Sequence, residues 1–376
     1  MLFLYMNPFF LEYIWVDGVG ELHSKIKVLY DFNQLLTNPS EVPRWNYDGS
    51  STGQAEGNNS EITLIPRALF NNPHRENSMI VLCDTWAREH PIEETNHEEP
   101  LIPALYNNRN YATTVFENET VVNHEPWYGL EQEYFLRPCG FTDENFKHIL
   151  ETYHLTMPGR AYCGIGRGAI HATQRKIVEE HMDACIKAGI TISGINAEVA
   201  PFQWEFQVGP CEGIKAADQL WVARYLLHKI AEKHMYEVIL SPKIDGIDNA
   251  INGSGCHTNF STKYMREACS SHNAVDALYG IPAIKKAIKN LESKHDEHMA
   301  VYGEGNNLRM TGKCETADYN TFSYGVGSRT VSIRIPNDVY TSGEGYFEDR
   351  RPASNNDPYL VTAILAKTVI IDDNDH

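Results

Sequence analysis

The chain has 376 residues, of which 42% are hydrophobic and 11% aromatic, a composition typical of a folded globular protein and not of a disordered one. Its 50 acidic and 32 basic residues give a net charge of −18, which argues against a general nucleic-acid binder because phosphate contacts need clustered Lys and Arg. The length exceeds that of one ordinary hydrophobic core and predicts about two domains.

The cysteines and the N-terminus both bear on the compartment. The eight cysteines form no C-x-x-C pair and no regular ladder, so a reducing compartment is expected and we predict a cytoplasmic protein. The apolar run at residues 1–11 contains no basic residue and is not followed by a small-residue cleavage site. It is also too short to span a bilayer. We therefore expect neither a secretory signal nor a membrane segment.

The N-terminal part of the sequence predicts a small β-rich domain over residues 1–95. β-Branched and aromatic residues are concentrated in three short runs that predict strands. These runs are residues 12–17, 26–30 and 78–86. Residues 46–60 are polar and rich in Gly and Asn, which predicts a loop. The Pro- and acid-rich segment 91–103 is interpreted as a linker.

A second domain, residues 104–376, alternates predicted strands with amphipathic helices. Apolar residues at helical spacing predict three helices. These are residues 174–188, with Gly189 as the stop, 220–238 and 282–299. Strand candidates are residues 128–136, 190–195, 202–208 and 329–335. The pattern indicates an α+β domain with an antiparallel sheet and flanking helices.

Glu131 and Glu133 are the first candidate site residues. They are separated by one residue in a predicted strand, so their side chains point to the same face. Two like charges a few ångströms apart repel unless a cation lies between them, and a divalent cation with oxygen ligands is one resolution. An exposed strand face with two solvated carboxylates is the alternative, and this motif alone does not separate the two.

Glu198 and Glu205 form a second acidic pair. Pro201 lies between them and cannot donate to a strand ladder, which favours two adjacent strands that each offer one inward carboxylate. Glu205 is flanked by Trp204 and Phe206, where an unpaired carboxylate would be costly to bury. A ligand role is therefore favoured over a solvated one.

Residues 252–261 form a glycine-rich motif. Gly253 and Gly255 allow backbone amides to approach a ligand closely. His257 follows as a metal ligand, as a charged partner of a carboxylate or as a purely structural residue. The neighbouring acidic strands favour a functional role.

Arginines recur in loop and strand-end contexts in the C-terminal part of the chain. They are Arg309, Arg329, Arg334, Arg350 and Arg351. In an acidic chain they indicate anion recognition, because guanidinium groups bind carboxylate and phosphate with paired hydrogen bonds. Ordinary surface ion pairs are the alternative for each. Glu348, close to Arg350, supplies one more oxygen ligand.

Together these groups describe a metal site that handles two anions, as phosphoryl transfer requires. Neither a Walker A motif nor a kinase glycine-rich signature is present in the sequence, so neither of those folds is expected.

Seven segments resemble the eukaryotic-type class of glutamine synthetase in order and spacing. They are WNYDGSST (45–52), PWYGLEQEY (126–134), NAEVAPFQWEFQVGPCEG (196–213), LWVARY (220–225), NGSGCHTNFSTK (252–263), SIRIP (332–336) and GYFEDRRP (345–352). The resemblance covers about residues 12–365. It implies an N-terminal β-grasp domain followed by a catalytic domain of the glutamine synthetase and guanidino-kinase type.

The resemblance also implies the ligands of each site. ATP would be the co-substrate, with two or three Mg²⁺ or Mn²⁺ ions in each active site. One ion would be held by Glu133, Glu198 and Glu205, and another by Glu131, His257 and Glu348. L-Glutamate would contact Glu133, Asn252, Gly253, His257, Arg309 and Arg350. The nucleotide would contact Glu131, Glu205, Asn259, Ser261, Arg329 and Tyr346.

In the implied reaction the γ-carboxylate of glutamate attacks ATP, and ammonia then attacks the γ-glutamyl phosphate. Arg334, together with Arg329, would act at the transferring phosphate, and Asp48 of an adjacent subunit would take a proton from ammonium. Glu315 would close the site as a flap and exclude water. The resemblance implies a homo-oligomer of two stacked pentameric rings, a decamer, with active sites between subunits.

Some positions depart from the family pattern. Cys314 stands where the family usually has His, Ile251 where it usually has Trp, and residues 139–160 differ from the usual segment. None of these is a predicted contact residue, so we expect activity to be retained. The apolar N-terminus replaces the family's usual helical extension, which could weaken the ring or indicate a different assembly. Two alternatives stay open: a γ-glutamyl ligase for an amine other than ammonia, and a ring-forming relative without activity. The presence of all six predicted metal ligands argues against the second.

Overall fold

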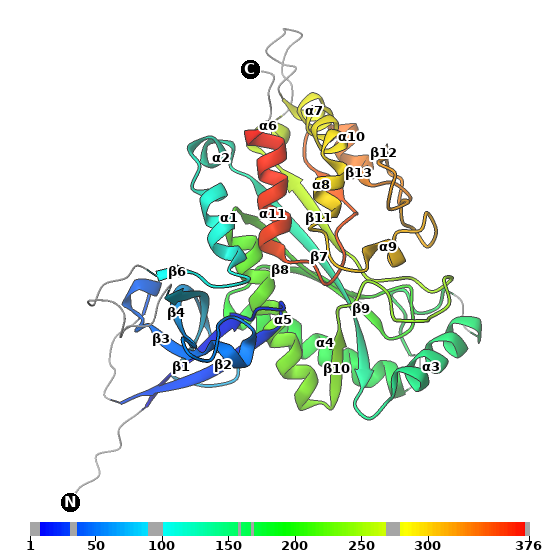
Figure 1. The fold of residues 1–376 in the computed structure, drawn as a ribbon. Coiled ribbons are helices and arrows are strands. Elements are labelled where there is room, and N and C mark those ends of the chain that lie inside the picture. Colours follow the sequence, from blue (N-terminus) through cyan, green and yellow to red (C-terminus); the bar gives the residue numbers. More distant parts are fainter. Residues whose placement is uncertain are drawn as a thin grey trace, which may run out of the picture. The chain divides into compact units, whose positions relative to one another are not determined.

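The computed structural model describes residues 8–30, 36–88, 101–156, 159–166, 169–267 and 279–372, without the side chains of residues 169–172. The chain divides into two compact units (Figure 1). The first consists of residues 1–111 and 184–190, and the second of residues 112–183 and 191–376.

The first unit is built on a mixed six-stranded sheet. Its strands are Phe9–Val16 (β1), Leu22–Leu29 (β2), Trp45–Asp48 (β3), Glu61–Asn71 (β4), Ser78–Arg88 (β5) and Leu101–Pro103 (β6). Their order is β2-β1-β5-β4-β3, with β6 paired to β5. β1 runs parallel to β5, and the other pairs are antiparallel. Alternate β1 residues Leu11, Tyr13 and Trp15 point into one core with Leu64 and Val81.

The second unit is built on an eight-stranded sheet. Its strands are Trp127–Pro138 (β7), Ile192–Ala197 (β8), Gln203–Glu212 (β9), Tyr236–Ile239 (β10), Cys256–Ser261 (β11), Tyr324–Val326 (β12), Ile333–Ile335 (β13) and Phe347–Asp349 (β14). The order is β12-β13-β14-β11-β7-β9-β8, with β10 paired to β7. The sheet is antiparallel as predicted, except that β12 runs parallel to β13 at one edge.

Helices complete the described chain. They are Asn108–Phe116 (α1), Glu119–His124 (α2), Asp143–Thr156 (α3), Ala169–Ala188 (α4), Lys215–Lys233 (α5), Lys263–Arg266 (α6), Gly280–Ser293 (α7), His295–Met299 (α8), Asn306–Arg309 (α9), Asn337–Ser342 (α10) and Pro358–Ala366 (α11), which continues into a π-helical turn, Lys367–Ile371. Short 3₁₀ turns lie at Pro39–Glu41 and Gly49–Thr52. α5 packs against β7, β9, β10 and α11. No helix in the described part of the chain is both long and apolar enough to cross a bilayer.

Local sequence explains where several helices begin and end. α11 begins at Pro358 because the Asp357 side chain accepts a hydrogen bond from the backbone N–H of Tyr359, a typical N-cap. α4 ends before Gly189, which has a φ of +90° that glycine adopts without strain.

The predicted fold class is confirmed, since a strand-rich N-terminal unit is followed by an α+β unit with flanking helices. The predicted strands at 12–17, 26–30 and 78–86 correspond to β1, β2 and β5, and those at 128–136, 190–195 and 202–208 to β7, β8 and β9. The ends differ by a few residues. Of the predicted linker, residues 91–100 lie outside the described residues, and 101–103 form β6.

Other boundaries were wrong for identifiable reasons. The helix predicted at 220–238 ends at Lys233, because Met235 turns the chain with a φ of 60° and Tyr236–Ile239 pairs with β7. The helix predicted at 282–299 is interrupted at Lys294, whose φ of −114° is not helical. The strand predicted at 329–335 is limited to β13.

The polar composition of two segments hid short strands. The segment predicted as a loop at 46–60 includes most of β3, which pairs with β4. The glycine-rich motif at 252–261 is a loop only up to Gly255, and β11 follows it and pairs with both β7 and β14. Both β3 and β11 form because they hydrogen-bond to neighbouring strands, which local composition does not reveal.

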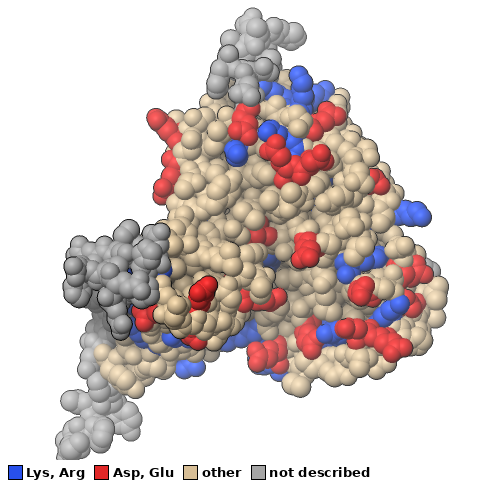
Figure 2. All heavy atoms as spheres, in the orientation of Figure 1, with Lys and Arg blue, Asp and Glu red and all other residues tan. Residues whose placement is uncertain are grey.

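The cysteines and surface charge are consistent with the composition. Each cysteine among the described residues has a free thiol, and Cys269 lies outside them. Acidic and basic side chains are interspersed on the face drawn in Figure 2.

Candidate active site

A polar cavity of about 200 Å³ lies in the second unit. Most of the predicted site residues line it. They are Glu131, Glu133, Glu198, Glu205, Asn252, Gly253, His257, Arg309, Glu315, Arg329, Arg334, Glu348 and Arg350. The other lining residues are Tyr162, Asn196, Gln203, Gln207, Cys314 and Thr316. The structure therefore brings together carboxylates and arginines that are up to 219 positions apart, from Glu131 to Arg350.

Strand alternation directs the carboxylates to one face of the sheet. On β7, Glu131 and Glu133 line the cavity while Leu130 and Tyr134 are buried on the opposite face. On β9 the same alternation places Glu205 at the cavity. Two groups of side chains result, each with ligand atoms within 4.8 Å of one another.

The carboxylate cluster consists of Glu133, Glu198 and Glu205. Burial raises the pKa of Glu133 well above its usual range, and the charges of Glu198 and Glu205 raise it further. Burial also raises the pKa of Glu205, to about 8. Two charges at this spacing repel by roughly 4 kcal/mol at an intermediate dielectric, so the cluster favours a cation among its oxygens.

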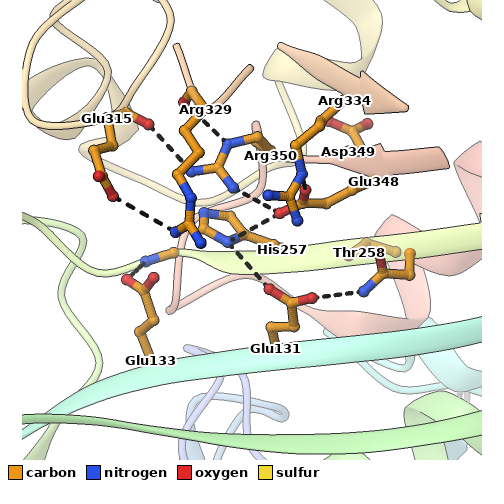
Figure 3. Close-up of polar contacts among 12 residues, drawn as sticks. Glu131, Glu133, His257, Thr258, Glu315, Arg329, Arg334, Glu348, Asp349 and Arg350 are labelled. Atoms are coloured by element: carbon orange, nitrogen blue, oxygen red, sulfur yellow. Dashed lines mark hydrogen bonds and ion pairs between the residues drawn. The ribbon is translucent and has the colours of Figure 1, made fainter. Parts of the chain in front are cut away.

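The histidine cluster consists of Glu131, His257 and Glu348 (Figure 3). His257 Nδ1 lies 3.5 Å from Glu131 Oε2 and 3.6 Å from Glu348 Oε1. Burial, with the positive charge of Arg350, holds the pKa of His257 well below its usual range, so its ring is neutral and able to coordinate a cation.

Arginines neutralise one member of the histidine cluster. Arg350 Nη1 lies 2.7 Å from Glu348 Oε1, and Arg334 forms an ion pair with Glu348 Oε2. Glu348 is fully buried. A fully buried carboxylate between two guanidinium groups is compensated without a cation, although its oxygens remain within ligand distance of His257 and Glu131.

Arg309 is buried beside the glycine-rich loop, and burial lowers its pKa to about 10. Its Nη2 group donates to the backbone oxygens of Arg350, Arg351 and Pro352. An added Cβ at Gly253 would lie 2.7 Å from the Arg309 side chain, so only glycine fits there. Part of the Arg309 guanidinium group thus stabilises the backbone of residues 350–352 at the cavity.

Glu315 lines the cavity beside Arg329 (Figure 3). Its Oε2 is 3.8 Å from Arg329 Nη1, and its backbone oxygen accepts a hydrogen bond of 3.2 Å from Arg350 Nη2. Cys314 and Glu315 both have left-handed φ values, 50° and 61°. Two such residues in succession are sterically unfavourable and mark a constrained turn. The Cys314 thiol contacts the backbone oxygen of Asn249 at 3.2 Å.

Three predicted nucleotide contacts lie beside the cavity and not in its lining. Asn259 donates a hydrogen bond of 2.8 Å to Glu131. Ser261, farther along β11, accepts one of 3.0 Å from Arg266. Tyr346 is 40% exposed, which leaves its ring available to a ligand.

Asp48 belongs to the first unit and is not a lining residue of the cavity. Its exposed carboxylate caps the 3₁₀ turn that follows it. Oδ1 accepts from the backbone N–H and the hydroxyl of Ser50, and Oδ2 accepts from the Ser51 hydroxyl at 2.9 Å. These donors, the Ser50 hydroxyl first, lower the pKa of Asp48 and keep it ionised.

Sequence reasoning missed the carboxamide side chains of the cavity. Gln203 and Gln207 lie two residues on either side of Glu205, so strand alternation alone places them on its face. Asn196 is the cross-strand neighbour of Glu205 on β8. The alternation of polar residues with Trp204 and Phe206 was the available signal.

Both clusters suit hard divalent cations. Each offers three ligands, all oxygen in the carboxylate cluster and two oxygens with one neutral ring nitrogen in the histidine cluster. Glu205 lies on β9 as predicted, whereas Glu198 lies just after β8 and not within a strand. Carboxylate oxygens are the preferred ligands of Mg²⁺, and Mn²⁺ accepts imidazole nitrogen as well. The donor set therefore fits the predicted ions.

Clusters of potential metal ligands beside guanidinium groups, on a sheet that lines a polar cavity, are typical of enzymes that transfer phosphoryl groups. Comparison with known proteins gives the family. Residues 106–370 match the family described as "Glutamine synthetase, catalytic domain". The chain belongs to the glutamine synthetase family, and its relatives place it in the eukaryotic-type class.

Similar proteins cover nearly the whole chain. Glutamine synthetase N-1 of Phaseolus vulgaris is 48% identical over 368 residues, which are 96% of this chain and 93% of the relative. Glutamine synthetase cytosolic isozyme 1-3 of Arabidopsis thaliana is 48% identical over 96% of this chain and 94% of its own length. Glutamine synthetase cytosolic isozyme 2 of Glycine max is 49% identical over 96% and 93%. The resemblance inferred from the motifs is confirmed.

Proposed function

We propose that this glutamate–ammonia ligase makes glutamine in two steps. The γ-carboxylate of L-glutamate attacks the terminal phosphorus of ATP and releases ADP, which leaves γ-glutamyl phosphate. Ammonia then attacks the acyl carbon and releases inorganic phosphate. Phosphorylation is needed because a carboxylate oxygen is a poor leaving group, whereas phosphate is a good one.

The two clusters would hold the divalent cations, Mg²⁺ or Mn²⁺. The carboxylate cluster would take one ion and the histidine cluster another, and a third would share their carboxylates. When bound, the ions would supply positive charge to the phosphate oxygens during transfer. The donor set of each cluster supports this assignment.

The arginines of the cavity would bind the anionic groups of the substrates. Arg334 and Arg329 would neutralise the charge that develops on the transferring phosphate. Glutamate would contact Glu133, Asn252, Gly253, His257, Arg309 and Arg350, and the nucleotide would contact Glu131, Glu205, Asn259, Ser261, Arg329 and Tyr346. The support is that all of these residues line the cavity or, for Asn259, Ser261 and Tyr346, occupy β11 and the residue before β14.

Two residues would serve the second step. Asp48, supplied by an adjacent subunit, would accept a proton from ammonium and so generate the nucleophile. The donors that lower its pKa keep the carboxylate ionised, which supports the attraction of ammonium to it. Glu315 would close over the cavity and keep water from the acyl phosphate. Its place beside Arg329, on a constrained turn, supports the flap assignment.

The assembly and compartment are part of the proposal. Two stacked pentameric rings with active sites between subunits would supply Asp48 to each cavity. A cytoplasmic location is supported by relatives that are named cytosolic isozymes. The proposed domain division, residues 1–95 and 104–376, follows the strand-rich and α+β parts of the chain.

The single observation that carries the proposal is the gathering of two candidate cation clusters and three arginines, Arg329, Arg334 and Arg350, at one cavity. The test is phosphate release from ATP and L-glutamate with Mg²⁺, compared among ammonium, ethylamine and putrescine. Ammonium should give the fastest turnover. Faster turnover with a larger amine would identify a different γ-glutamyl ligase, and no turnover with any amine would identify a non-catalytic relative.

A further inference from the structure

The carboxylate cluster is held by neutral groups, unlike Glu348 in the histidine cluster. Each of its three members accepts a hydrogen bond from one carboxamide side chain. The pairs are Gln203 Nε2 to Glu133 Oε2 at 3.3 Å, Asn196 Nδ2 to Glu198 Oε1 at 2.8 Å, and Gln207 Nε2 to Glu205 Oε1 at 2.7 Å.

The remaining donors to these carboxylates are also neutral. The backbone N–H of Gly255 donates to Glu133 at 2.7 Å, and that of Val199 donates to Glu198 at 3.1 Å. Across the described ranges of the chain, no lysine or arginine forms an ion pair with any member of the cluster. Neutral donors therefore orient the carboxylates of the cluster, and no cationic side chain among the described residues forms a direct ion pair with them.

The backbone makes room for this arrangement. Gly194 pairs with Gln207 between β8 and β9, and an added Cβ at Gly194 would lie 2.9 Å from Gln207 Oε1. Gln203 is only 2% exposed, and its amide also donates to the Gly253 carbonyl and the Ser254 hydroxyl at 3.0 Å each. Gln203 thus connects Glu133 to the glycine-rich loop.

We propose that Asn196, Gln203 and Gln207 are positioning residues that orient the three carboxylates of the cluster for one divalent cation without adding a positive charge beside them. A lysine or arginine in the same places would orient the carboxylates but compete with the cation. A carboxamide supplies the hydrogen bond with no net charge. Partners of this kind commonly change metal affinity 10–100-fold when they are removed.

This inference rests on the proposed function, because it assumes that the carboxylate cluster binds a cation. It further distinguishes the two glutamines. Loss of Gln207 should weaken binding of the cation without raising the KM for glutamate, since among the described residues its carboxylate partner is Glu205, which is not in the proposed glutamate site. Loss of Gln203 should also raise the KM for glutamate, because Gly253 belongs to the proposed glutamate site.

The test is direct Mn²⁺ binding to the full-length, metal-stripped protein, followed by electron paramagnetic resonance without substrates. In Gln207→Met one class of bound Mn²⁺ should weaken about 10–100-fold while the other is unchanged. Gln219→Met is the matched control. Its carboxamide oxygen accepts a hydrogen bond from the backbone N–H of Thr191, and Gln219 is not a lining residue of the cavity.

The outcomes are separable. If the parent protein binds no Mn²⁺, the proposed metal site itself fails. If the parent binds Mn²⁺ and Gln207→Met binds it equally well in every class, the positioning role is overturned. Circular dichroism checks folding, and Asn196→Ala, at a half-buried position, carries the same test should Gln207→Met not fold.

For Gln203→Met, a raised KM for glutamate with an unchanged KM for ATP is expected, and equal changes in both would contradict the link to Gly253.

Discussion

Glu133 and Glu205 stand directly opposite each other in the ladder between β7 and β9. Like charges at such cross-strand positions destabilise a sheet. Alternation directs both side chains to the cavity, so the sheet keeps an unfavourable pair at the place where a cation is proposed to bind. The pair is an example of function maintained at a cost in stability.

Glu205→Gln should therefore separate stability from metal binding. Burial raises the pKa of Glu205 to about 8, so at pH 7 folding must either bury its charge or take up a proton. A neutral glutamine avoids this cost and should raise the free energy of unfolding of the metal-free protein by roughly 1 kcal/mol. The same change should weaken Mn²⁺ binding and abolish most activity. Urea unfolding of the metal-free protein, with Mn²⁺ titration, measures both. A less stable variant with normal Mn²⁺ affinity would contradict the account.

A second prediction concerns the buried ion pair behind Glu348. Arg351 and Asp349 are both fully buried and are joined by two hydrogen bonds, 2.9 and 2.7 Å long. Tyr302 also donates to Asp349 at 2.8 Å. Arg351→Met leaves the Asp349 charge uncompensated and should cost about 3–5 kcal/mol of unfolding free energy.

The control for that prediction is Arg137→Met. Arg137 forms ion pairs with Asp143 and Glu237, which are 91% and 48% exposed at their side chains, so its loss should cost less than about 1 kcal/mol. Denaturant unfolding compares the two variants. Equal losses of unfolding free energy in the two variants would contradict the prediction that burial makes the Arg351 pair more costly to break.

Buried histidines predict a pH dependence of stability. Burial lowers the pKa of His181 and of His228 to about 4, from 6.5 when unfolded. Between pH 6.5 and 4 the unfolded chain binds more protons, so the free energy of unfolding falls as the pH drops through this window. Each histidine accounts for up to roughly 3 kcal/mol, and neither contributes above pH 6.5.

His181→Gln tests this dependence. The variant should lose less stability than the parent between pH 6.5 and 4, whereas His148→Gln, at an exposed position, should follow the parent. Urea titrations at several pH values measure the difference between the curves. Parallel curves for the parent and His181→Gln would refute the assignment.

Asp48 predicts a change in the pH profile of activity. Asp48→Asn should lower kcat by roughly 10²–10⁴-fold if Asp48 is the base. In Ser50→Ala/Ser51→Ala the carboxylate loses two hydroxyl donors, its pKa rises, and the acidic limb of the pH–rate profile should move to higher pH. Ser24→Ala, exposed on β2, is the control. An unmoved acidic limb would argue against Asp48.

The proposed flap role of Glu315 predicts that its loss uncouples phosphate release from glutamine formation. Without the Glu315 side chain, water should reach the acyl phosphate, so Glu315→Ala should release more than one phosphate for each glutamine formed. Phosphate and glutamine are measured in the same reaction. A ratio that stays at one, with normal turnover, would remove Glu315 from the flap role.

The sequence predicted which carboxylates share one face of a strand better than it predicted element boundaries. Pairs such as Glu131 and Glu133 could be assigned to one face from spacing alone, because strand alternation is a local rule. The interruption at Lys294 could not, since α8 directs His295 to Arg351, a contact between residues 56 positions apart. Gln207 was missed because an uncharged carboxamide is not a typical metal ligand. Its proposed role depends on its hydrogen bond to Glu205 on the same strand.

The most direct test of the central claim uses L-glutamate labelled with ¹⁸O in its γ-carboxylate, with ATP, Mg²⁺ and ammonium. If γ-glutamyl phosphate forms, one carboxylate oxygen leaves with phosphorus, and the released phosphate should carry one ¹⁸O atom for each glutamine made. Phosphate without ¹⁸O, alongside normal glutamine formation, would show that the γ-carboxylate does not attack ATP and would contradict the account.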